Sequence, residues 1–333
     1  MTEQLKLKLN DSKATRWGAL VIVAFTMMAA YYVNDVVAPL KTMLETDLAW
    51  SSTDFGFFTG GYSFLNVFFL MLIWGGLILD RFGIRFTGKL ATILMVGGTA
   101  LEYYAMTGLA GADATLFGIN EIFGYKTGVF VAFAGYSIFG VGAEVAGITV
   151  SKIIAKWFKG KELATAMGVQ VALARIGSQA GYAVAIPLAR AFGISTPVLL
   201  GLVLLLGGMI AFFVFAVMDK KLDKQMEAAA IAAGTEDEEE KFSFKDVKNI
   251  LVNPGFWLIA LLCVLFYSCV FPFQKFASEL MIIKYGINEN VAGTFAGLPA
   301  LGALILTPVF GGFIDKRGKS ASIMLLGSAM LIC

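Results

Sequence analysis

Long apolar runs recur from one end of the chain to the other, and they limit the folds that it can adopt. An α-helix needs about 20 predominantly apolar residues to cross a hydrocarbon core about 30 Å thick. Runs of this length indicate helices, because the strands of a membrane barrel are short and alternate in polarity. The expected spans are residues 17–42, 54–79, 87–109, 127–155, 162–190, 196–218, 256–284 and 290–314, with a further run from residue 320.

The composition supports an all-α membrane protein and excludes other classes. Hydrophobic residues make up 58% of the chain and charged residues 15%, against about 25% charged residues in soluble domains. The net charge of +2 indicates no nucleic-acid partner. Histidine, the commonest metal ligand and general base, is absent, so we predict no metal and no other cofactor. We expect a monomer whose partners are the lipid bilayer and a small-molecule substrate.

The motifs of enzymes and nucleotide-driven pumps are missing. The sequence has no HExxH run, no serine–histidine set and no G-x-x-x-x-G-K-[ST] run. A secondary transporter is therefore the predicted function, and a receptor that binds a solute without moving it is the alternative from another class.

Basic residues concentrate in every second connection, which predicts the orientation. By the positive-inside rule these connections and the N-terminus are cytoplasmic. The expected location is the inner (cell) membrane of a bacterium. The basic residues are Lys6, Lys8, Lys13 and Arg16 in the tail, then Arg81, Arg85, Lys89, Lys152, Lys156, Lys159, Lys161, Lys316, Arg317 and Lys319.

One long polar stretch, residues 219–253, divides the chain. It includes an acidic run at residues 236–240 and reads as a solvated, partly helical cytoplasmic linker. The predicted domains are thus a six-helix bundle at residues 1–218, the linker, and the start of a second bundle at residues 254–333.

A short motif occurs at the same place in each half. GGLILDRFGIR follows the second span and GGFIDKRGK follows the eighth. The glycines would permit a tight turn and close helix approach, and the charged residues would pair with neighbouring helix ends as a gate. The residues concerned are Gly76, Asp80, Arg81, Gly83 and Arg85, with Asp315 and Arg317 in the second copy.

This repeated loop resembles the signature loop of the major facilitator superfamily, whose two halves are structural repeats. The resemblance implies two six-helix bundles and transport by alternating access. It also implies twelve spans, so that this sequence would end within the ninth, as a truncation.

A narrower resemblance comes from WFKGKEL, ALARIGS, GVGAE and VFPF. Together they are similar to the branch that contains the animal lysosomal dipeptide uniporter and its bacterial relatives. The resemblance implies that Glu144 and Arg175 bind the two ends of a dipeptide. Tyr136 stands where the superfamily often has an arginine, which weakens any proton coupling that depends on that position.

The depths of these two charges agree with a shared site. Arg175 lies 13 residues beyond Glu162, roughly 20 Å into the bilayer, and Glu144 lies roughly 18 Å from the end of its helix. An arginine at that depth costs at least about 2.5–3.5 kcal/mol without a partner or water. A zwitterion would use a guanidinium and a carboxylate together. A gating pair that breaks on binding and a purely structural ion pair are the alternatives.

Further polar residues at similar depth are weaker candidates for substrate contact. Tyr31 and Tyr32 would face a cavity or an interfacial aromatic belt, and Asp35 would bind an amine or be solvated at the outer mouth. Gln170 would orient a peptide group or bond another helix. Glu102 is a proton site or interior packing.

From the seventh span, Tyr267 is predicted to face the cavity and Pro272 to kink the helix as part of a gate. A proton-coupled carrier of organic anions or sugar acids remains the alternative substrate class, with Arg175 as anion site and Glu144 as proton site.

Overall fold

The structure, a computed structural model, describes residues 8–111, 115–233, 251–317 and 320–332, without the side chains of residues 164, 229–233, 307–317, 320–321 and 331–332. These residues are almost entirely helical, which confirms the predicted fold class. The elements are η1 (Leu9–Asp11), α1 (Lys13–Val36), η2 (Ala38–Leu40), α2 (Lys41–Asp47), α3 (Ser52–Phe68), α4 (Met71–Thr107), β1 (Glu121–Ile122), β2 (Tyr125–Lys126), α5 (Thr127–Trp157), α6 (Leu163–Phe192), α7 (Thr196–Ala233), α9 (Pro254–Tyr285), α10 (Glu289–Arg317) and α11 (Ser320–Ile332).

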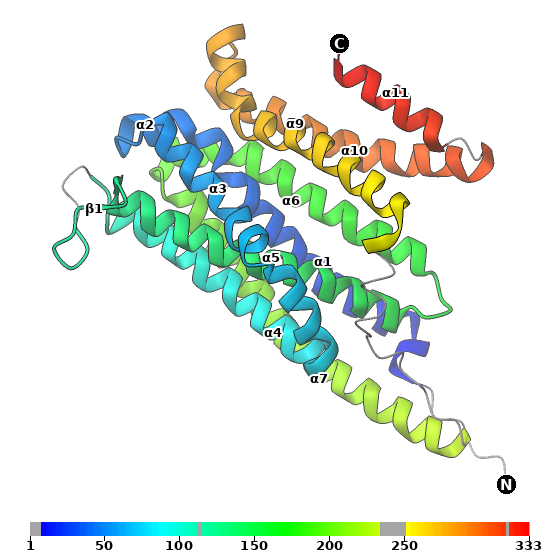
Figure 1. Ribbon diagram of the computed structural model, residues 1–333. Coiled ribbons are helices and arrows are strands. Elements are labelled where there is room, and N and C mark those ends of the chain that lie inside the picture. The colour runs from blue at the N-terminus through cyan, green and yellow to red at the C-terminus, as the bar shows by residue number, and fades with distance from the viewer. Residues whose placement is uncertain (1–7, 112–114, 234–250, 318–319, 333) are drawn as a thin grey trace.

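Two groups of helices lie side by side (Figure 1). The first bundle contains α1 and α3 to α7, with its main contacts between α4 and α5, α1 and α6, and α3 and α5. The second group begins with α9 and α10, and α10 packs along α6. We call the end at which α1 begins the basic end, and the end that carries α2 and the β1–β2 hairpin the hairpin end (Figure 1).

Glycines allow the helices of the first bundle to pack closely. A Cβ atom at Gly98 of α4 would lie 2.4 Å from the backbone nitrogen of Phe139 in α5. A Cβ atom at Gly177 of α6 would lie 2.1 Å from the carbonyl oxygen of Met28 in α1. Because lipid tails give no hydrophobic drive for association, such small-residue contacts are how helices pack in membranes.

The prediction of a single helix at residues 54–79, the expected second span, is wrong. The chain breaks between α3 and α4, which meet at 57°, and Leu70 adopts a left-handed conformation with φ of 52°. The helix is interrupted again at Gly83, whose φ of 75° and ψ of 173° suit glycine alone. The first break carries neither glycine nor proline, so the local sequence does not mark it.

Five described helices are long and apolar enough to cross a membrane, or six if the bent pair α3–α4 counts as one span. The predicted count was eight complete spans. Helix α6 has the expected length but falls outside the five, because Gln170, Arg175 and Gln179 lower its apolar character. Its polar residues indicate a helix that faces protein or water along part of its length.

Helix α7 continues beyond residue 218, where the linker was expected to begin, and ends at Ala233. Asp219, a residue of that extension, is completely buried. The acidic run at residues 236–240 lies outside the described residues.

Candidate functional site

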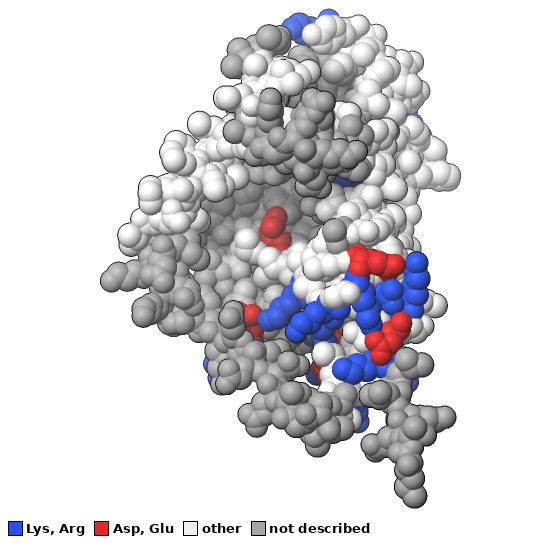
Figure 2. Space-filling view, turned by 90° about the vertical axis from the view of Figure 1, so that its right-hand side faces the viewer, with Lys and Arg blue, Asp and Glu red and all other residues white. Residues whose placement is uncertain are grey.

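A cavity of about 520 Å³ lies between the first bundle and α9. A volume in this range suits a small organic ligand. Figure 2 shows a hollow in the molecular surface with acidic side-chain atoms at its floor. Among the residues that the structure describes, the cavity lining contains two charged side chains, Glu144 and Lys275. The rest of the lining is Met27, Ala30, Tyr31, Asn34, Gly56, Thr59, Gly60, Tyr62, Ser63, Ala143, Gly147, Phe271, Pro272 and Phe276.

Glu144 lies in the cavity wall and is held in place by a neighbouring helix. The Tyr62 hydroxyl of α3 donates a hydrogen bond of 2.7 Å to the Glu144 Oε1 atom. One turn earlier, Gly140 lets α3 approach α5, because a Cβ atom there would lie 2.3 Å from the Tyr62 carbonyl oxygen. The carboxylate is therefore oriented by Tyr62 and still faces the cavity.

Arg175 lies beside the cavity rather than in its lining. Its guanidinium carbon is 5.7 Å from the centre of the Tyr31 ring, which does line the cavity. Helices α5 and α6 contact each other little, since α6 packs mainly on α1 and α10. Among the contacts of the described residues, no ion pair joins Arg175 to Glu144. Equal depth in consecutive helices therefore does not bring these two charges together in this conformation.

The other predicted contacts divide between the cavity and its surroundings. Tyr32 points away, because its hydroxyl donates to the Pro197 carbonyl of α7 at 3.2 Å. Gln170 is half-buried and lies outside the lining. Tyr267 is 48% exposed and stacks on Phe271, with ring centres 5.0 Å apart.

Pro272 lines the cavity, but α9 remains one helix through it from Pro254 to Tyr285. Glu102 is fully buried in α4, and neither carboxylate oxygen has a hydrogen-bond partner in the described part of the chain. It lies behind Gly135, where a Cβ atom would be 2.9 Å from the Glu102 backbone nitrogen. Glu102 is not part of the cavity lining.

Lys275 of α9 is a cavity residue that the sequence reasoning missed. Its ammonium donates to the Asn34 carbonyl oxygen at 2.5 Å and to the Tyr136 hydroxyl at 3.2 Å. It also lies 3.6 Å from the Asp35 carboxylate. A lone lysine within an apolar span was the available signal, because the argument from insertion cost applies to it as it does to Arg175.

The signature loop makes its contacts inside the first bundle. Asp80 accepts from the Lys152 ammonium of α5 at 2.8 Å, and Arg81 lies over the Phe82 ring. Arg85 pairs with Asp219 at 3.3 Å and also with the neighbouring Asp223 of α7. The Asp315 and Arg317 side chains of the second copy lie outside the described residues.

The two glycines of this loop have different roles. Gly83 provides the positive φ at which α4 is interrupted. A Cβ atom at Gly76 would meet nothing within 4 Å, so the expected close approach is not made there. It is made by Gly75, where a Cβ atom would lie 2.5 Å from the Val145 side chain.

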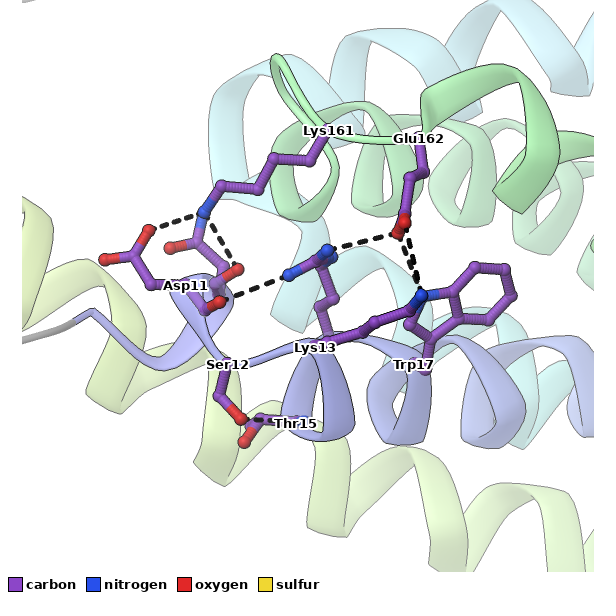
Figure 3. A network of polar contacts seen from close by, with 9 residues as sticks. Asp11, Ser12, Lys13, Thr15, Trp17, Lys161 and Glu162 are labelled. Atoms are coloured by element: carbon purple, nitrogen blue, oxygen red, sulfur yellow. Dashed lines mark hydrogen bonds and ion pairs between the residues drawn. The ribbon is translucent and has the colours of Figure 1, made fainter.

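A second polar network fastens the N-terminal segment to the α5–α6 turn at the basic end (Figure 3). We call it the N-terminal clasp. Glu162 accepts hydrogen bonds of 3.1 Å from Arg16 and from the Trp17 indole, and these bonds hold the pKa of its carboxyl below the usual value. Lys161 donates to Asp11 at 2.5 Å and lowers the pKa of that carboxyl in the same way.

Besides the contacts of Lys275, further polar contacts join the first bundle to the second group at the hairpin end. Lys41 of α2 pairs with Glu279 of α9 at 2.5 Å, and Arg190 of α6 pairs with Glu289 of α10. The Tyr182 hydroxyl of α6 donates to the Gln274 carbonyl of α9 at 3.1 Å. These contacts join the two groups at the hairpin end.

Several proteins are similar in sequence to this chain over most of its length. The lysosomal dipeptide transporter MFSD1 of Homo sapiens is 27% identical over 321 residues, which cover 92% of this chain and 63% of that protein. The protein of the same name from Pongo abelii is 27% identical over 315 residues, covering 90% and 61%. The chain thus spans a little over three-fifths of the length of these relatives.

Solved structures of similar fold include two xylose transporters. The partially occluded inward-open conformation of XylE from E. coli has a TM-score of 0.60 at 16% identity, covering 92% of this chain and 74% of that one. A D-xylose-proton symporter has a TM-score of 0.56 at 15% identity, covering 90% and 69%. These likenesses show the fold. The family model described as Major Facilitator Superfamily matches residues 17–333, and the chain belongs to that superfamily.

Proposed function

We propose that this transporter carries small zwitterions, most simply dipeptides, by alternating access. The observation that supports it best is Glu144, a carboxylate that Tyr62 orients in the wall of a cavity between two helix groups. Such a group can bind an ammonium by charge-assisted hydrogen bonds. The relatives named as dipeptide transporters support the same substrate class.

The conformation fits one stage of such a cycle. With the N-terminus in the cytoplasm, the hairpin end faces outward, and the ion pairs of Lys41 and Arg190 close the cavity on that side. The contacts of Asp80 and Arg85 stay within the first bundle, so they leave the two groups free to part at the basic end. The molecule is then inward-facing. Rocking about the cavity would open the hairpin end instead.

Arg175 and Tyr31 form the second charged element of the proposed site. The guanidinium stacked on Tyr31 places positive charge beside the cavity without neutralising Glu144. We propose that Arg175 attracts the anionic end of the substrate electrostatically from its position over the Tyr31 ring, outside the cavity lining.

The test is uptake of a radiolabelled dipeptide by the protein reconstituted in liposomes. Wild type should take up the dipeptide, and Glu144→Gln and Arg175→Lys should each lose most of the uptake. Glu121→Gln, an exposed acid in the hairpin, is the control and should transport normally. A wild type that ignores dipeptides but takes up organic anions along a pH gradient would replace the proposal by the anion carrier. Binding without uptake would indicate a receptor.

A further inference from the structure

The two charged side chains of the cavity lining come from different helix groups. Glu144 belongs to α5 of the first bundle, and Lys275 belongs to α9 of the second group. Arg175, the cation expected from the sequence, lies over the Tyr31 ring and is not part of the cavity lining. The cation that reaches the cavity in this conformation is therefore Lys275.

The hydrogen bonds of Lys275 do not neutralise its positive charge. A lysine ammonium has three donors. Two are used, by the Asn34 carbonyl and the Tyr136 hydroxyl, and both acceptors are neutral. The Asp35 carboxylate is 3.6 Å away, beyond the roughly 2.7–2.9 Å of a charge-assisted hydrogen bond. Asp35 itself accepts at 2.9 Å from the Asn34 side chain.

Burial makes this incomplete pairing significant. The Lys275 side chain is 16% exposed, and its ammonium lies 5.7 Å from the centre of the Tyr136 ring. A cation in such surroundings gains more from a directly bonded anion than it would in water. A carboxylate that enters the cavity would supply a directly bonded anion in addition to the longer ion pair with Asp35.

We propose that Lys275 binds the carboxylate of the substrate while Glu144 binds its ammonium. This inference rests on the proposed function and deepens it, because it assigns the anionic end of a zwitterion to a residue of the second helix group. A dipeptide in extended form spans roughly 7 Å, within the reach of a cavity of this volume. A substrate held by both residues bridges the two groups.

The proposed bridge predicts that the preferred substrate carries both charges. A ligand with only an ammonium engages the first bundle alone, and a ligand with only a carboxylate engages α9 alone. Lys275 already joins α9 to Asn34 and Tyr136 of the first bundle. A zwitterion would add a second link, from Lys275 through the substrate to Glu144.

The experiment measures binding of alanyl-alanine and of its C-terminal amide to the purified protein in detergent. The amide lacks only the carboxylate. Wild type should prefer the free acid by roughly 10- to 100-fold, as expected for a charge-assisted hydrogen bond. Lys275→Met should bind both ligands within about threefold of each other, with an affinity for the amide close to that of wild type. Lys275→Arg should keep most of the preference.

Two further variants separate the roles of the charges. The double variant Lys275→Met/Asp35→Asn removes both members of the ion pair. It therefore controls for misfolding that an unpaired Asp35 would cause in Lys275→Met. Arg175→Met should keep the preference for the free acid. N-acetyl-alanyl-alanine lacks the ammonium. Wild type and Lys275→Met should bind it more weakly than alanyl-alanine, whereas Glu144→Gln should lose this preference.

The outcomes are distinct for the two proposals. Wild type that binds neither ligand overturns the proposed function and this inference with it. Wild type that prefers the free acid, with the same preference in both Lys275→Met variants, overturns this inference alone. Loss of the preference in Arg175→Met but not in Lys275→Met would give the carboxylate to Arg175.

Discussion

The basic end and the hairpin end of the molecule both carry ion pairs. Those at the basic end connect helices of one bundle, and those at the hairpin end connect the two helix groups. At the basic end, Asp219 is bonded by Arg85, Lys156 at 2.7 Å and the Trp157 indole at 3.0 Å, all within the first bundle. At the hairpin end, Lys41 and Arg190 reach across to α9 and α10. Pairs within one bundle persist when the bundles move as rigid bodies, whereas pairs between them must break. Under the proposed rocking motion, the first network stabilises a bundle and the second stabilises a conformation.

The largest effect is expected at the basic end. Asp219→Ala removes a fully buried acceptor and leaves Arg85 and Lys156 with less compensation, which should cost about 3–5 kcal/mol of unfolding free energy. Unfolding in detergent, followed by circular dichroism, measures it. Asp223→Ala, whose carboxylate is 40% exposed, is the matched control and should cost below about 1 kcal/mol. Equal stability of Asp219→Ala and wild type would contradict the stabilising role.

At the hairpin end, Glu279→Gln should change the conformation more than the stability. Lys41 keeps its 2.8 Å pair with Glu45, so the substitution removes only the contact between bundles. Losing about 1.5–3 kcal/mol there should shift the ratio of inward- to outward-facing molecules by roughly 10- to 150-fold.

Spin-label distances between the β1–β2 hairpin and the loop at residues 286–288 measure that ratio. Asp80→Asn is the control, because Asp80 pairs with Lys152 inside the first bundle. An unchanged distance distribution in Glu279→Gln would show that this ion pair does not hold the hairpin end closed.

A third comparison uses the two glycines of the signature loop. Gly83→Ala places a side chain at φ of 75° and should cost about 1–3 kcal/mol of unfolding free energy. Gly76→Ala, in open space within helix α4, should be neutral or stabilise by up to about 1 kcal/mol. Thermal unfolding of the two variants decides it, and equal melting temperatures would rule out a special backbone requirement at Gly83.

The smallest effect is a pH dependence of the N-terminal clasp. The pKa of Glu162 is lowered by its bonds to Arg16 and Trp17, and that of Asp11 by Lys161. Stabilisation by these carboxylates is therefore complete above their ordinary pKa values of 4.5 and 3.8 and is lost as the pH falls through the lower, folded values.

Hydrogen exchange of residues 8–17 should accelerate below pH 4.5, after correction for the intrinsic rate. In Glu162→Gln the same residues should exchange faster already at pH 7, with a weaker dependence on pH. A segment that stays equally protected down to pH 3 would show that the clasp does not depend on these charges.

The helices were well predicted because the length of an apolar run is a local property. The spans expected at residues 127–155 and 256–284 are Thr127–Trp157 and Pro254–Tyr285 in the structure. The superfamily was also predictable, from the signature loop, and the family match confirms it. The break at Leu70 was not predictable, since no glycine or proline marks it.

The sequence could not predict which helices lie next to each other in the plane of the membrane. Depth in the bilayer placed Glu144 and Arg175 at one level, but it does not say which helices touch. Tyr62 of α3 and Lys275 of α9, which are far away in the chain, are the residues that meet Glu144 or share its cavity. The substrate contacts of Glu144 and Arg175 stay predictions.

The modest apolarity of α6 has a consequence for how the protein enters the bilayer. A helix with Gln170, Arg175 and Gln179 partitions poorly into lipid as an isolated segment. It is retained once a partner helix covers its polar positions, and Gly177 sits directly against Met28 of α1. Because α1 is synthesised first, its surface is already in the membrane when α6 leaves the ribosome. Assembly of the first bundle is then part of the insertion of α6.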